Sequence, residues 1–259
     1  NERKLVNNQL ILTEDGYKID FHLLERQAKD PSVKMMIISS PHNPVGKIFT
    51  EYELRKIGEI CSKNNVLLIS DEIHQDLIFK GCKHTCTAML SDEIADNTIT
   101  CIAPSKTFNI AGLQLSAVII PDKIKRDIFF KYIMTKGLFG SNIFGIAAGE
   151  AAYKYGEPWL NSLLEYLEGN IDFMENFFKE SLPVVKMHRP QATYLAWLDF
   201  RSLGLSQEEL VRRMVHRAGL GLNDGSSFGP GGEGFMRLNF ACPRSTLEEG
   251  LKRIKNVIY

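Results

Sequence analysis

Three short apolar segments of the sequence are each followed by polar side chains that could do chemistry. These side chains are Asn43, Asp71, His74 and Lys106. A lysine amine can form an imine with an aldehyde, and it attacks best when it is partly desolvated and therefore neutral. A carboxylate can keep a ring nitrogen protonated, and an amide can hold a phenolic oxygen through a hydrogen bond. The set therefore favours a ligand that offers an aldehyde, a pyridine nitrogen and a phenolic oxygen.

Each of these residues also has an ordinary structural explanation. Asn43 precedes a proline, and this pair is a common turn former. Asp71 could cap a helix, His74 could be a surface or core residue, and Lys106 could lie on an exposed loop. Taken together, however, the residues match the needs of pyridoxal 5′-phosphate. The hydroxyl group of Ser105, next to the lysine, could then bind the phosphate.

Four apolar runs predict the strands that would position these residues. The runs span 35–40, 66–70, 98–103 and 115–121. Continuous apolar runs are typical of strands buried on both faces. Between the first two runs, Thr50 and Glu53 form a capping-box pattern at the start of a helical segment. The resulting β-α-β unit predicts an α/β fold with a mostly parallel, helix-covered sheet, and ligands bind at the carboxyl ends of such strands.

The pattern changes in the last part of the chain. Residues 141–179 have helical periodicity, and Pro158 is placed in the first turn of a second helix. Two strands and two helices are then expected, at 192–200, 206–218, 235–241 and 245–258. Both late helices open with a capping-box pattern, at Ser206 and at Ser245. This mixture predicts a smaller C-terminal α+β domain.

Composition limits the classes of partner. The 31 basic residues balance the 31 acidic ones, which argues against nucleic acid and against an anionic membrane surface as partners. No apolar run approaches the roughly 20 residues of a membrane helix. The five cysteines form no CxxC pair, which argues against a disulfide framework and against a metal site such as zinc. We therefore expect a cytoplasmic protein whose partner is a small molecule.

Six segments of the sequence, in their order, resemble a known family. They read PHNPVGK, SDEIHQDLIF, SKTFNIAGLQ, GEPWLNSLLEYLEGN, ATYLAWLDFR and RLNFACPRS. The series resembles fold-type I pyridoxal phosphate enzymes of the class I and II aminotransferase superfamily, and within it the cystathionine β-lyase or cystalysin branch of carbon–sulfur lyases. The resemblance implies an aspartate aminotransferase-like fold. It implies a partial large cofactor-binding domain over 1–160, and a connecting helix with a small domain over 161–259.

The resemblance also implies a role for individual residues. Lys106 matches the lysine that binds the cofactor and later removes the substrate Cα proton. Asp71 matches the partner of the pyridine nitrogen, and Asn43 matches the ligand of the phenolic oxygen. Arg237 matches the arginine that binds the substrate α-carboxylate through its bidentate fork. His74 follows the aspartate by three residues, where many aminotransferases carry tyrosine, and this difference favours the lyase branch.

Two positions depart from the family pattern, and the start of the chain differs as well. Ala103 stands where many relatives carry a phosphate-binding serine, and Gln114 stands where many aminotransferases carry arginine. Complete members begin well before the segment that resembles Asn1, so we expect an N-terminally truncated chain. The absent part would carry a phosphate-binding turn at a helix N-terminus.

The expected activity follows from the resemblance. It is α,β-elimination from cystathionine or cysteine-type amino acids to pyruvate, ammonia and a thiol, by a homodimer of the full-length protein. A first alternative is an aminotransferase that uses the same residues. A second is a catalytically silent fragment or a regulatory protein that acts through protein contacts.

Overall fold

The structure is a computed structural model that describes residues 3–138 and 140–259. Contacts between residues divide it into two compact units. The parallel-sheet unit comprises Phe21–His42 and Ile48–Leu163. The antiparallel-sheet unit comprises the residues up to Asp20 together with Asn43–Lys47 and Leu164–Tyr259. The units part between Leu163 and Leu164, inside a long helix, and the expected domain limits at 160 and 161 stay a prediction.

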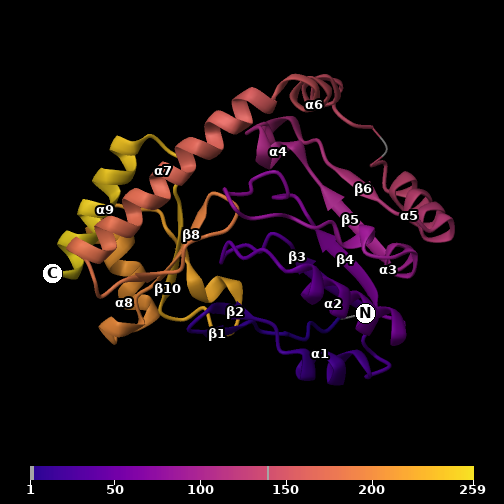
Figure 1. Cartoon of the computed structure of the whole chain (residues 1–259), viewed down its shortest axis with the longest axis horizontal. Helices are drawn as coiled ribbons and strands as arrows, with labels where there is room; N and C mark the ends of the chain where they lie inside the picture. Colours follow the sequence, from indigo (N-terminus) through magenta and orange to yellow (C-terminus); the bar gives the residue numbers. More distant parts are fainter. Residues whose placement is uncertain (1–2, 139) are drawn as a thin grey trace. The chain divides into compact units, whose positions relative to one another are not determined.

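The parallel-sheet unit confirms the predicted α/β architecture. Its strands are β3 (Met35–Ser39), β4 (Leu67–Asp71), β5 (Thr98–Ile102) and β6 (Ala117–Ile119). They lie side by side in that order (Figure 1), with β3, β4 and β5 parallel and β6 antiparallel to β5. The four apolar runs of the sequence therefore form the four strands of one sheet.

Helix α2 (Glu51–Lys63) connects β3 to β4 and begins as the sequence predicts. Thr50 and Glu53 form both hydrogen bonds of the capping box: the Thr50 N–H donates to the Glu53 carboxylate at 2.8 Å, and the Glu53 N–H donates to the Thr50 hydroxyl at 3.2 Å. The apolar face of α2, including Leu54 and Ile57, is buried. The capping box satisfies two N–H groups that the first helical turn leaves without partners.

The expectation that the strands are buried on both faces is wrong for this sheet. Ile38 and Leu68 point to one face and are buried, whereas Met35 and Ile37 point to the other and are 48% and 66% exposed. Side chains alternate between the two faces of a strand. On this second face Leu67 and Ile69 of β4 are only half-buried. The described residues therefore cover one face fully and the other only in part, even though the strands are apolar on both.

Several helices complete the parallel-sheet unit. They are α1 (Phe21–Ala28), α3 (Asp92–Asp96), α4 (Pro104–Thr107), α5 (Lys123–Thr135), α6 (Ile143–Tyr155) and the short 3₁₀ helices η1 (Thr87–Met89) and η2 (Ala111–Leu113). Helix α7 (Glu157–Ser181) starts in this unit and has Pro158 as its second residue, as the sequence predicts. Within the described ranges, no helix combines the length and the apolar content needed to cross a bilayer.

The antiparallel-sheet unit contains the predicted late strands. Its sheet has the order β7 (Lys186–Met187), β8 (Leu195–Asp199), β10 (Phe235–Asn239), β9 (Asn223–Asp224). A separate hairpin is formed by β1 (Ile11–Thr13) and β2 (Gly16–Lys18). The helices are α8 (Gln207–Arg212), the π-helical turn η4 (Arg213–Arg217), α9 (Arg244–Ile258), η3 (Arg201–Leu203) and η5 (Gly225–Phe228). Together, α8 and the π-helical turn η4 form the helix that the sequence predicts at 206–218.

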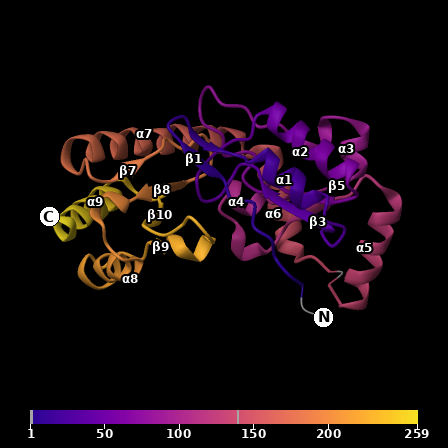
Figure 2. The same cartoon turned by 90° about the horizontal axis from the view of Figure 1, so that it is seen from below.

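The two late capping predictions have different outcomes. Ser206 caps α8, because its hydroxyl accepts a hydrogen bond from the Glu209 N–H at 3.2 Å. The prediction for Ser245 is wrong, because α9 begins one residue earlier, at Arg244. The Arg244 N–H donates to the Tyr166 hydroxyl of α7 at 2.7 Å. Helices α7 and α9 run alongside each other (Figure 2). The tyrosine of α7 therefore provides a hydrogen-bond acceptor for an N–H group in the first turn of α9, where a local serine was expected to do so.

The segment 43–47 is held in the antiparallel-sheet unit through Gly46. Its carbonyl accepts hydrogen bonds from the N–H groups of Gln191 and Ala192, at 2.9 and 3.2 Å. Gly46 has a φ of +68°, and a Cβ at this position would lie 2.6 Å from Cβ of Pro190. The close approach and the positive φ together require glycine here.

We predict that Gly46→Ala lowers the free energy of unfolding by about 2 to 4 kcal/mol, because left-handed strain adds to a steric clash. Gly204→Ala is the matched control: Gly204 has a φ of +62°, and a Cβ there would meet nothing within 4 Å. The control should lose only about 1 to 2 kcal/mol. Urea unfolding of both variants measures the difference, and equal losses would contradict the proposed clash.

Candidate functional site

Asp71 is the last residue of β4, at the carboxyl edge of the parallel strands. It stands opposite Ser39 of β3 and Cys101 of β5 in the sheet register. Its carboxylate accepts a hydrogen bond from the Ile73 N–H at 3.3 Å. Burial raises the pKa of Asp71 above its ordinary value, while the Ile73 N–H and the charge of Lys106 oppose this shift. The carboxyl group is thus held in place and lies within electrostatic reach of the lysine.

Lys106 lies on α4, the short helix that follows β5. Pro104 opens this helix, and proline suits a first helical position because its φ is already helical. The lysine and its neighbour Ser105 are both half-buried. Because β4 and β5 are parallel, their carboxyl ends meet at one edge of the sheet, which is the edge that carries both Asp71 and the helix of Lys106.

The turn that carries the lysine is tied to the turn that follows β4. Thr107 is fully buried, and its hydroxyl donates to the Asp76 carboxylate at 2.8 Å. Phe108 continues this turn and packs edge-on against Tyr153, with ring centroids 5.7 Å apart. Lys106 is therefore carried by a short segment that is anchored immediately after it. Sequence reasoning missed the contact, because its partners are 31 residues apart and follow no periodic pattern.

Glu72, directly after the aspartate, is the second feature that sequence reasoning missed. The side chain is fully buried and accepts hydrogen bonds from the Ser70 hydroxyl at 2.8 Å and the Thr87 N–H at 3.0 Å. His84 lies 2.8 Å from its other oxygen. Burial raises the pKa of Glu72, but the bonds from His84, Thr87 and Ser70 outweigh it and hold the pKa below its ordinary value. This buried network fixes the backbone next to Asp71.

The remaining predicted residues divide between the two units. His74 is buried on the turn after β4, with 3% of its surface exposed, in the same unit as Asp71 and Lys106. Asn43 and Arg237 belong to the antiparallel-sheet unit. There the Arg237 Nη1 donates to the Asn43 Oδ1 at 2.7 Å. Two predicted residues that are 194 positions apart in the sequence are thus direct partners.

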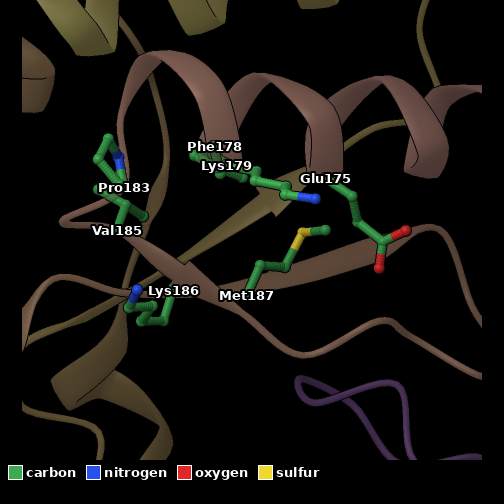
Figure 3. Close-up of a pocket in the computed structure, with 7 residues that line it drawn as sticks. All are labelled: Glu175, Phe178, Lys179, Pro183, Val185, Lys186 and Met187. Atoms are coloured by element: carbon green, nitrogen blue, oxygen red, sulfur yellow. The ribbon is translucent and has the colours of Figure 1, made fainter.

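A separate pocket of about 360 Å³ lies between the end of α7 and strand β7. It is lined by Glu175, Phe178, Lys179, Pro183, Val185, Lys186 and Met187. Figure 3 shows the side chains of Lys179 and Met187 in the space between the helix and the strand. The lining includes none of the predicted site residues, so this pocket is not the candidate site.

We predict that Glu72→Gln destabilises the fold in a pH-dependent way. The folded-state pKa lies below the ordinary value of 4.5, so the ionised carboxylate stabilises the fold above that pH. This contribution disappears as the pH falls through the folded-state pKa. Urea unfolding at neutral pH should show a loss of about 1 to 3 kcal/mol.

The same measurement at about pH 4 should show a smaller loss, because Glu72 of the unfolded chain, with an ordinary pKa of 4.5, is then largely protonated and unfolding gains the free energy of binding that proton. Glu59→Gln, at an exposed position of α2, is the matched control and should change stability by less than about 0.5 kcal/mol. A loss for Glu72→Gln that does not vary with pH would argue against a stabilising charge.

Comparison with known proteins gives close relatives. Cystathionine beta-lyase PatB of Bacillus subtilis (strain 168) is 50% identical over 255 residues, which cover 98% of this chain and 66% of that protein. Protein MalY of Escherichia coli (strain K12) is 33% identical over 259 residues, which cover 100% of this chain and 66% of that protein. The chain thus spans just under two thirds of the length of these relatives.

A solved structure and a family description agree with these relatives. The crystal structure of cystalysin from Treponema denticola, which contains a pyridoxal 5′-phosphate cofactor, superimposes with a TM-score of 0.96 at 38% identity. The match covers 98% of this chain and 65% of that one. The description of the family named aminotransferase class I and II matches residues 7–254. The chain therefore belongs to the class I and II aminotransferase family.

Proposed function

We propose that the full-length protein is a pyridoxal 5′-phosphate-dependent carbon–sulfur β-lyase. It would act on cystathionine or cysteine-type amino acids and release a thiol, pyruvate and ammonia. The observation that carries this proposal is the 50% identity, over almost the whole chain, to a protein named cystathionine beta-lyase. The closeness of Asp71 and Lys106 at neighbouring strand ends supports it.

The residues present fit the proposed cofactor. When bound, pyridoxal phosphate supplies an aldehyde for covalent attachment and a ring that accepts electrons from a broken Cα–H bond. Lys106 offers the amine for that aldehyde, and the hydrogen-bonded Asp71 offers a carboxylate for the ring nitrogen. Ser105 offers a hydroxyl to the phosphate. His74, buried three residues after Asp71, completes the proposed cofactor-binding residues of this unit.

Asn43 suits the phenolic oxygen for a separate reason. Its Oδ1 already accepts from Arg237, and its amide nitrogen, which can only donate, is the group that we propose for the ligand. A phenolate oxygen needs such a donor. Arg237 would bind the substrate α-carboxylate, and a guanidinium group suits this anion because it can donate two parallel hydrogen bonds.

In the proposed reaction Lys106 acts as general base. Its Nζ accepts the proton that leaves Cα, and the electron pair of that bond leads to departure of the sulfur group from Cβ. Asp71 opposes loss of charge at the ring nitrogen, and Arg237 keeps the substrate oriented through its carboxylate. The sulfur group would leave as a thiolate with the bonding pair of the C–S bond and take up a proton to become the thiol, and hydrolysis of the remaining product would yield pyruvate and ammonia.

We further propose that the full-length protein is a cytoplasmic homodimer with an amino acid as its small-molecule partner. The five cysteines lie in the described part of the chain and are all free thiols, which supports a reducing compartment. Exposed apolar side chains on α5 and α6, such as Phe130 and Phe144 at 57% and 73%, support association with another chain.

An aminotransferase that uses the same residues is the second candidate. The family description supports it, because it names aminotransferases and covers residues 7–254. A transaminase needs a keto acid to accept the amino group, whereas elimination needs no acceptor. The two activities therefore differ in a measurable requirement.

The test is incubation of the full-length protein, supplied with pyridoxal 5′-phosphate, with L-cystathionine in the absence of keto acid. We expect release of thiol and pyruvate. Lys106→Ala should lower the rate by about 100-fold or more, because the general base is lost. It should also abolish covalent fixation of the cofactor by borohydride. Lys63→Ala, an exposed lysine on α2, is the matched control and should behave as the wild type.

Two outcomes would contradict the proposal. A turnover that requires a keto acid would identify the aminotransferase. Full activity of the Lys106→Ala variant would show that this lysine is neither the attachment point nor the base.

A further inference from the structure

The guanidinium group of Arg237 is held by more than Asn43. Asn223 of β9 stands directly opposite Arg237 of β10 in the antiparallel register. Directly opposed side chains of neighbouring strands lie close enough to interact. The Asn223 Oδ1 accepts from both Nε and Nη2 of the arginine, at 3.3 and 2.8 Å. Asn223 thus covers one complete edge of the guanidinium group.

The same guanidinium group lies over the ring of Phe228. Its central carbon lies 4.8 Å from the ring centroid. Phe228 in turn meets Trp197 edge-on at 5.4 Å, and Trp197 stacks on Phe235 at 5.1 Å with an angle of 8° between the rings. This aromatic stack of Phe228, Trp197 and Phe235 belongs to the unit that carries Arg237. The guanidinium group is therefore held by a cation–π contact as well as by hydrogen bonds.

Counting donors shows which edge of Arg237 faces a ligand. A guanidinium group has five N–H bonds. Asn223 accepts from two of them and Asn43 accepts from one. A guanidinium group can offer two parallel N–H bonds along its Nε–Nη2 edge or at its end, between Nη1 and Nη2. Because Asn223 occupies the first of these, a carboxylate that forms two parallel hydrogen bonds must approach end-on.

We propose that Asn223 and Phe228 are positioning residues that orient Arg237 for end-on binding of a carboxylate. The role of Arg237 as the substrate carboxylate ligand rests on the proposed function, whereas the orientation itself rests on contacts within one unit. A preoriented guanidinium group loses less rotamer freedom when the anion binds. Asn223 leaves the arginine fully charged because its amide oxygen is neutral, and an aspartate there would compete with the substrate.

The first test examines the orientation without substrate or cofactor. The exchange rate of the Arg237 Nε hydrogen is measured by NMR in the purified chain, and its signal is identified by its absence in Arg237→Lys. We expect Asn223→Ala to speed exchange about tenfold, because a hydrogen bond to a charged donor is lost. Asn176→Ala, at an exposed position of α7, should leave the rate unchanged. An unchanged rate in Asn223→Ala would overturn the proposal.

The second test examines binding in the full-length enzyme. Asn223→Ala should raise KM for the amino-acid substrate about tenfold with kcat nearly unchanged, because binding common to substrate and transition state is lost. Asn223→Asp should raise KM further by pairing with Arg237, and Asn176→Asp provides the control for added charge. The carboxamide of the same substrate has no anion, so its KM should not change.

The possible results separate this proposal from the proposed function. A wild-type enzyme without elimination activity would refute the lyase assignment, while the exchange measurement would still decide the orientation of Arg237. Faster exchange with an unchanged KM would show that Asn223 orients an arginine that does not bind the substrate carboxylate, and would overturn the proposed positioning role. Equal effects on acid and carboxamide would overturn it as well.

Discussion

The parallel pairing of β4 with β5 is the constraint on which the candidate site depends. It sets Asp71 opposite Cys101, and the chain enters the helix of Lys106 shortly afterwards, so carboxyl and amine emerge at one edge. The Glu72 N–H extends the pairing by donating to the Cys101 carbonyl at 2.8 Å. A slip of one residue would turn every side chain of β4 to the opposite face. The buried bonds of Glu72, together with the anchor from Thr107 to Asp76, oppose such a slip.

The antiparallel-sheet unit positions its polar residues by the same means. Arg237 and Asn223 face each other because backbone hydrogen bonds set the register of β10 and β9. Asn43 reaches the arginine because the segment around Gly46 is hydrogen-bonded to residues 191 and 192, far along the chain. In both units the polar side chains are attached to backbone segments that are fixed by sheet pairing or by buried polar contacts. Each group thus loses little conformational entropy when a ligand binds.

Local signals in the sequence predicted much of this structure. The apolar runs located the strands of the parallel-sheet unit, the capping pattern at Thr50 located the start of α2, and Ser206 located the start of α8. These signals succeed because a strand run or an N-cap depends on a few neighbouring residues. The pattern at Ser245 failed because Tyr166, on another helix, satisfies the first turn instead. The prediction that both faces of the parallel sheet are buried was also wrong, because the apolar composition of a strand does not determine which other residues pack against it.

The sequence by itself determined the residue types of the site, their order, and the strand ends that carry Asp71 and Lys106. It also carries the family pattern in which Asn43 and Arg237 have a role. Only the tertiary structure decided the partners of these residues, including the network of Glu72 and the contact of Asn223 with Arg237. The physical reason is the range of the interactions. Capping and strand periodicity act between near neighbours, whereas the contact of His84 with Glu72 and that of Asn223 with Arg237 join residues 12 and 14 positions apart.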